Sequence, residues 1–271
     1  MVATAIKKIS MAVASSAIVA LVAGGVSQAA IIVPNEVEAT EGNINNSWPF
    51  IANFQGRYQQ VFGASEFASL SKPQLISQIA FRPDSDFGSS NAFSSTVSSI
   101  LINLSTTKSA PDNLSKTFAD NVGVDNITVY SGALSLSSAD EGPVFGPKKF
   151  DIVINLQNPF LYDPTKGNLL LDVKNFVGAD MIFPFVPFDA QGNLSISNGD
   201  SDSVSRQWSF DPNFANADGL DTIGLITKFT FESEVVSVPE PSAALGTLAI
   251  SVWGAAALLK RKHHKKTTIN L

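Results

Sequence analysis

The side chains that most often carry catalysis are scarce in this chain. It contains no cysteine, and its two histidines, His263 and His264, stand side by side in a lysine-rich stretch. The 30–237 segment therefore has neither thiol nor imidazole, which excludes Ser–His–Asp and Cys–His catalysis and zinc sites built on these residues. A carboxylate pair, as in glycoside hydrolysis, is the chemistry that remains. No spacing singles out two of the acidic residues, so we assign no catalytic residue and expect a protein that is not an enzyme.

Oxygen ligands for a metal ion occur in one aspartate-rich stretch, 198–203. Its Asp200 and Asp202 are two residues apart, a spacing found in the oxygen-rich loops that bind calcium. The full calcium-loop pattern is absent, and a solvated turn explains the same residues. Asp84, in the sequence Asp84-Ser85-Asp86, is a weaker candidate of the same kind. We therefore expect no cofactor, with calcium as the alternative.

Carbohydrate binding is a second chemistry that the residue types allow. Aromatic rings on a sheet surface can stack on sugar rings, while amides and carboxylates bond the hydroxyl groups. Trp48, Tyr58 and Trp208 are the candidate sugar contacts, and the phenylalanine-rich stretch 183–188 could add an apolar surface on a loop. Packing in the core or under a loop is the alternative role of each.

The elements that would position these residues are strands. Ser, Asn, Asp, Gly and Phe are frequent and long runs of helix formers are few, which favours strands and turns. Apolar patterns predict strands at 58–62, 75–82, 96–104, 127–136, 150–156, 169–173, 207–210 and 223–231. Segment 64–70 fits a short helical turn or an edge strand, and the acidic 31–48 segment is expected to form an extended arm. The pattern predicts an all-β fold, a jelly-roll-like antiparallel β-sandwich, in one domain spanning 30–237.

The first 29 residues have the parts of a secretory signal peptide. Lys7 and Lys8 form a positively charged N-terminal region, and residues 9–26 are mostly apolar. Ser27 and Ala29 are small residues of the kind that signal peptidase accepts. We predict cleavage after Ala29, with an uncleaved membrane helix as the alternative. With either a cleaved signal peptide or an uncleaved helix, we expect the chain to be exported.

The last part of the chain, 238–271, begins with a rigid tetrapeptide. Its residues are Val238, Pro239, Glu240 and Pro241. Proline fixes its own φ and disfavours helix at the residue before it, so we expect Glu240 to be extended and accessible.

A short apolar segment and a basic cluster follow the tetrapeptide. Residues 242–259 carry no charge. As a helix they would rise about 27 Å, just short of the hydrocarbon core of a membrane at roughly 30 Å. The basic tail 260–271 opens with Lys260, Arg261 and Lys262, which places this end in the cytoplasm by the positive-inside rule. The pattern predicts a transmembrane helix, and an ordinary C-terminal anchor is its simplest interpretation.

Pro-Glu-Pro, a short span and a terminal basic cluster in this order resemble the PEP-CTERM sorting signal of bacterial envelope proteins. The resemblance is limited to about the last 34 residues. It implies recognition by an exosortase, a membrane enzyme expected to process the chain near the motif, after transient anchoring in the inner membrane. It also implies a final place in the cell envelope, on the outer surface or in the extracellular matrix, in bacteria that make exopolysaccharide.

The charge of the middle segment narrows the choice of partners. Of the 18 Lys and Arg, seven lie in the two ends, and of the 24 Asp and Glu only Glu240 does, which leaves 30–237 with a net charge of −12. Such a segment repels nucleic acid and anionic lipid headgroups. We therefore expect an exported, non-catalytic protein with a structural or adhesive role in a biofilm matrix. Its expected partners are signal peptidase, an exosortase-like enzyme, the membrane before processing, and polysaccharide. A carbohydrate-binding module or a carboxylate-based glycosidase is the alternative.

Overall fold

The computed structural model describes residues 29–50, 55–85, 92–177, 187–193 and 203–232. The predicted sorting signal, with its membrane span, and all but the last residue of the predicted signal peptide lie outside these ranges. The chain divides into two compact units, Met1–Glu232 and Ser233–Leu271, and every described residue belongs to the first. Within the described ranges, no helix has the length and apolarity that crossing a membrane requires.

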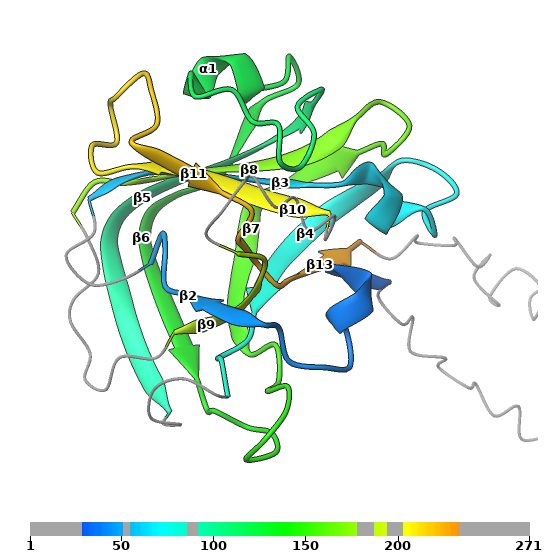
Figure 1. Ribbon diagram of the computed structural model, residues 1–271, viewed down its shortest axis with the longest axis vertical. Coiled ribbons are helices and arrows are strands. Elements are labelled where there is room, and N and C mark those ends of the chain that lie inside the picture. Colours follow the sequence, from blue (N-terminus) through cyan, green and yellow to red (C-terminus); the bar gives the residue numbers. More distant parts are fainter. Residues whose placement is uncertain (1–28, 51–54, 86–91, 178–186, 194–202, 233–271) are drawn as a thin grey trace, which may run out of the picture. The chain divides into compact units, whose positions relative to one another are not determined.

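The described residues form antiparallel sheets that pack together (Figure 1). A four-stranded sheet has the order β1 (Ala30–Val33), β13 (Thr227–Phe231), β4 (Gln74–Phe81), β7 (Ile152–Tyr162). A six-stranded sheet has the order β11 (Gly219–Asp221), β10 (Val204–Ser209), β3 (Gly56–Phe62), β8 (Asn168–Asn175), β5 (Phe93–Thr107), β6 (Ile127–Ser138). A small third sheet has the order β12 (Gly224–Leu225), β9 (Phe188–Gln191), β2 (Ile44–Asn46).

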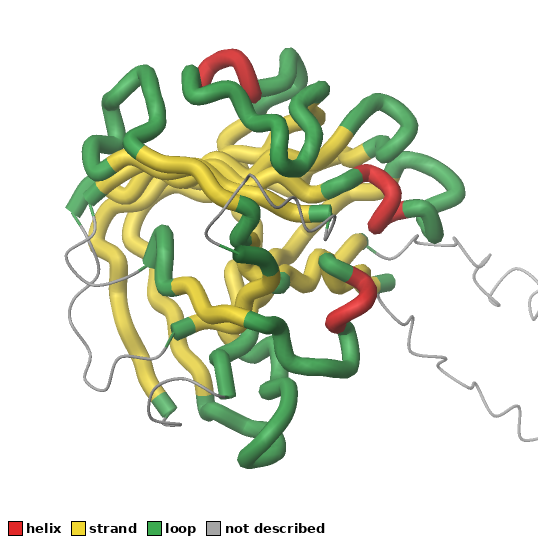
Figure 2. Tube along the Cα trace, in the orientation of Figure 1, coloured by secondary structure: helices red, strands yellow, loops and turns green. Residues whose placement is uncertain are grey.

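Helical structure is confined to short turns, as Figure 2 shows for the described residues. They are the 3₁₀ turns η1 (Asn35–Val37) and η2 (Ala64–Phe67) and the single α-helical turn α1 (Phe118–Asn121). The mostly-β antiparallel fold expected from the sequence is therefore confirmed.

The core lies between the six-stranded and four-stranded sheets. Phe62 of β3 and Phe67 of η2 both contact Phe229 of β13, with ring centroids 5.0 and 5.5 Å apart. All three side chains are fully buried. Edge-on and tilted ring contacts are the favoured geometries, and burying each ring contributes roughly 1.5–3 kcal/mol.

The six-stranded sheet is also covered on part of its outer face. In Figure 1 the segment that carries α1 lies over this sheet. The Gln59 amide nitrogen donates to the Phe118 carbonyl at 3.1 Å, and the Asn121 amide donates to Gln59 at 3.1 Å. Consecutive leucines in β8, between β3 and β5, are buried for this reason on both faces of the sheet.

Most of the predicted strands are present with shifted ends, two expectations change, and one open alternative is decided. The 31–48 segment is not an extended arm, because β1 pairs with β13, β2 pairs with β9, and Val33 is fully buried. The strand predicted at 223–231 is two strands, β12 and β13, in different sheets. Of the two alternatives for segment 64–70, the short helical turn is confirmed, because the segment begins with η2.

Candidate functional site

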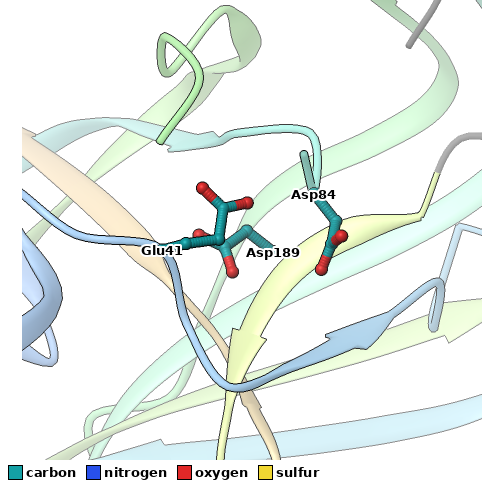
Figure 3. Close-up of side chains that lie close together, drawn as sticks. All are labelled: Glu41, Asp84 and Asp189. Carbon is teal, nitrogen blue, oxygen red and sulfur yellow. The ribbon is translucent and has the colours of Figure 1, made fainter. Parts of the chain in front are cut away.

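Three carboxylates from distant parts of the chain meet beside the small third sheet (Figure 3). They belong to Glu41, Asp84 and Asp189, and one oxygen of each lies within 4.8 Å of the others. We call this group the carboxylate cluster. Asp189 is fully buried and Asp84 is 7% exposed, whereas Glu41 is partly exposed.

Backbone pairing brings two members of the carboxylate cluster together. Asp189 lies in β9, and its N–H donates to the Arg82 carbonyl at 3.0 Å. Asp84 lies three residues after the end of β4, and its N–H donates to the Pro187 carbonyl at 3.0 Å. The chain after β4 therefore runs alongside β9 and carries Asp84 to Asp189.

The buried Arg82 guanidinium links the third member to the other two. Its Nε donates to Asp189 Oδ2 at 2.7 Å, and its Nη2 donates to the carbonyls of Val37 and Thr40 at 3.0 and 2.5 Å. Arg82 thus holds the turn that precedes Glu41 against β9. The N–H of Gly42 donates to Asp189 Oδ1 at 3.0 Å and fixes the other side of Glu41.

The electrostatics of the cluster are unbalanced. Burial raises the pKa of the Asp189 carboxyl to about 7, and the Glu41 charge adds to the rise while Arg82 opposes it. Glu41 Oε1 accepts the Ser85 N–H at 2.7 Å, but Glu41 Oε2 is buried and has no hydrogen-bond partner. When all three acids are ionised, Arg82 compensates one of three negative charges.

These residues suit cation binding better than glycoside hydrolysis. Oxygen-only donors are the ligands that hard cations such as calcium prefer. Glycosidase carboxylates flank a bound sugar, which the fully buried Asp189 cannot reach.

Three aromatic rings form a second group at the end of the six-stranded sheet. Trp48 lies edge-on to Trp208 and to Phe210, with both centroid separations 5.2 Å. We call Trp48, Trp208 and Phe210 the aromatic cluster. Phe210 is 63% exposed, while both tryptophans are half-buried.

Trp208 is the support of the aromatic cluster. A Cβ added at Gly219, its partner on β11, would lie 2.3 Å from the Trp208 ring, so only glycine lets the ring sit there. The Arg206 guanidinium lies 5.0 Å from the centre of the same ring. The most exposed ring of the aromatic cluster is that of Phe210.

The residues proposed from the sequence lie in different environments in the structure. It brings Trp48 and Trp208 together, but Tyr58 is a core residue without exposed surface, and its hydroxyl donates to Gln60 Oε1 at 2.7 Å. Tyr58 is therefore not a sugar contact. Asp200, Asp202 and the sorting residues lie outside the described ranges.

Sequence reasoning found one member of the carboxylate cluster and missed two. Asp84 is a weak calcium candidate in the sequence, whereas Glu41 falls in the predicted extended arm and no pattern singles out Asp189. No local spacing connects them, because they are brought together by the pairing of β9. No protein-family model matches the chain, and no curated protein matches it either.

Proposed function

We propose that this protein is an exported, non-catalytic component of the bacterial envelope or extracellular matrix, delivered by its C-terminal segment. The observation that carries the proposal is the order of features in 238–271: Pro-Glu-Pro, then 18 uncharged residues, then a basic cluster. This order resembles the PEP-CTERM signal, so we propose an exosortase-type enzyme as the processing partner.

Two further features support export. Residues 1–29 have signal-peptide composition, and 30–237 is strongly acidic, which suits a soluble displayed domain. We propose that 30–237 is that domain, that its sheets form a jelly-roll-like β-sandwich, and that 242–259 spans the inner membrane until processing. A structural or adhesive role in an exopolysaccharide matrix follows from this destination.

Mass spectrometry of the mature C-terminus tests the proposal. In the native host we expect surface fractions to contain a chain that ends close to Glu240. Glu240→Ala should keep its full tail and accumulate in the inner membrane, whereas Glu234→Ala, six residues upstream and outside the motif, should be processed normally. An intact tail on wild-type protein in surface fractions would exclude processing.

The aromatic cluster favours polysaccharide binding as a second candidate function. Phe210 and Trp48 offer apolar ring surface at the sheet end, and exposed Asn213 lies in the loop that follows Phe210. Aromatic surface beside hydrogen-bonding groups is what sugar rings require.

Affinity electrophoresis of the full chain in gels that contain exopolysaccharide tests this second candidate. Phe210→Ala should abolish any retardation, because it removes the most exposed ring of the aromatic cluster. Phe145→Ala, which removes an 85% exposed ring from another loop, should leave it unchanged. Equal retardation of both variants, or none of the wild type, would remove the candidate.

A further inference from the structure

We infer that the carboxylate cluster binds one hard divalent cation, with calcium as the preferred ion. The proposal concerns Glu41, Asp84 and Asp189 and does not depend on how the chain is sorted. Geometry, one orphaned oxygen and the local charge support it separately.

The geometry fits a single coordination sphere. Calcium binds oxygen at about 2.3–2.6 Å, so two ligand oxygens on opposite sides of the ion are about 4.6–5.2 Å apart. One oxygen from each of the three acids lies within 4.8 Å of the others. These separations are of the size that a shared ion requires, so small side-chain adjustments would let all three oxygens contact one ion, and water or second carboxylate oxygens would complete the sphere.

The orphaned oxygen is the independent sign of a missing partner. Glu41 Oε2 is buried and accepts no hydrogen bond, although its neighbour Oε1 accepts the Ser85 N–H. A buried acceptor without a partner is unfavourable and rare in folded proteins. If the only role of Glu41 were to accept the Ser85 N–H, its Oε2 would be more stable in contact with water. A cation between the three acids supplies the partner that this oxygen lacks.

The negative charge of the three acids favours a divalent ion. Arg82 is bonded to Asp189 Oδ2 and to backbone carbonyls, so it opposes the charge of one of the three acids. Three ionised acids place three negative charges in a largely buried space. A divalent ion offsets more of this charge than a proton or a monovalent ion does.

Calcium titration of the full chain tests the inference. The protein is purified in detergent, stripped with a chelator and followed by calorimetry and by thermal melting at fixed pH and ionic strength. We expect one calcium per chain and a melting temperature about 3–6 °C higher when free calcium is about ten times its Kd. Magnesium should bind more weakly, because it demands a tighter octahedral shell.

Matched variants separate binding from folding. Glu41→Gln should weaken calcium binding at least about tenfold, the loss of a direct charged ligand, while its stripped form melts no lower than the stripped wild type because a repelling charge is gone. Glu36→Gln, an exposed position in η1, should behave as wild type. Asp84→Asn provides a second test if Glu41→Gln fails to fold.

Three results would overturn the inference. They are the absence of calcium binding by the wild type, unchanged calcium affinity in Glu41→Gln, and stabilisation that follows proton concentration but not calcium. The last result would assign the cluster to a bound proton.

Discussion

Three arginines of the described residues, of which Arg82 and Arg206 are buried and Arg57 is partly buried, share one local arrangement. Each is paired with an aspartate on a neighbouring strand or segment and lies over an aromatic ring, at 4.6–5.0 Å from the ring centre. The three groups are Arg57 with Asp172 and Phe118, Arg82 with Asp189 and Phe150, and Arg206 with Asp221 and Trp208. The planar guanidinium can satisfy a carboxylate with its edge and a ring with its face, which suits a place inside a fold.

The pair of Arg57 and Asp172 gives a prediction about stability. The Asp172 side chain is 3% exposed, so Arg57→Met would leave a buried charge without its ionic partner. We expect the free energy of unfolding to fall by about 3–5 kcal/mol. Urea denaturation measures the loss.

An exposed ion pair is the control for this prediction. Lys149 and Glu141 form a surface pair with side chains 67% and 58% exposed. Lys149→Met should cause no measurable change, because solvent screens such pairs. Equal effects of the two substitutions would show that Asp172 finds another partner or is protonated.

At the scale of elements, the outer strands of the two large sheets are protected in different ways. β1 has four residues and β11 has three, too short to recruit another chain. β6 has 12 residues, and side chains of β7 occupy part of its outer edge. Gln157 exchanges two hydrogen bonds with the Ser131 backbone, at 3.0 and 3.1 Å, and Asn158 donates to the Thr128 carbonyl at 3.0 Å.

Removing these amides should expose the β6 edge. We predict that the double variant Gln157→Ala, Asn158→Ala forms dimers or larger assemblies, because free backbone groups on a long edge pair with other strands. Light scattering after size exclusion measures the assembly. Gln78→Ala removes an amide that contacts the Asn155 side chain instead of a backbone group, and it should remain like the wild type. A monomeric double variant would contradict the prediction.

The length of an element explains how much of the fold the sequence predicts. Long strands with alternating burial, such as β7 with buried Ile152 and Ile154, are recognisable from pattern alone. The third sheet is different, since β12, β9 and β2 have two, four and three residues. Two or three residues cannot display a period of two. The carboxylate cluster depends on β9, so it could not be predicted before this sheet was known.

At the scale of the whole molecule, the cluster and the chain ends illustrate opposite limits of sequence reasoning. The carboxylate cluster can be recognised only when its three residues are seen side by side. In the sequence, 148 positions separate Glu41 from Asp189. The proposed sorting signal is defined by the order of its residues along the chain, so a sequence pattern can suggest it without knowledge of the fold. A site built from residues that are distant in the sequence can be predicted only when the topology is known. A signal built from consecutive residues can be predicted from the sequence alone.

The pairing of β1 with β13 limits when the four-stranded sheet can form as the chain emerges. These are the first and last strands of the described chain, with Ala30 opposite Thr230. A polypeptide that is threaded through a membrane from its N-terminus releases β1 earliest and β13 latest. On the proposed route of export, the four-stranded sheet, in which β13 separates β1 from β4, would not close until nearly the entire domain had passed through. Such long-range closure is slow, and until then β1 must stay unpaired and protected from wrong partners.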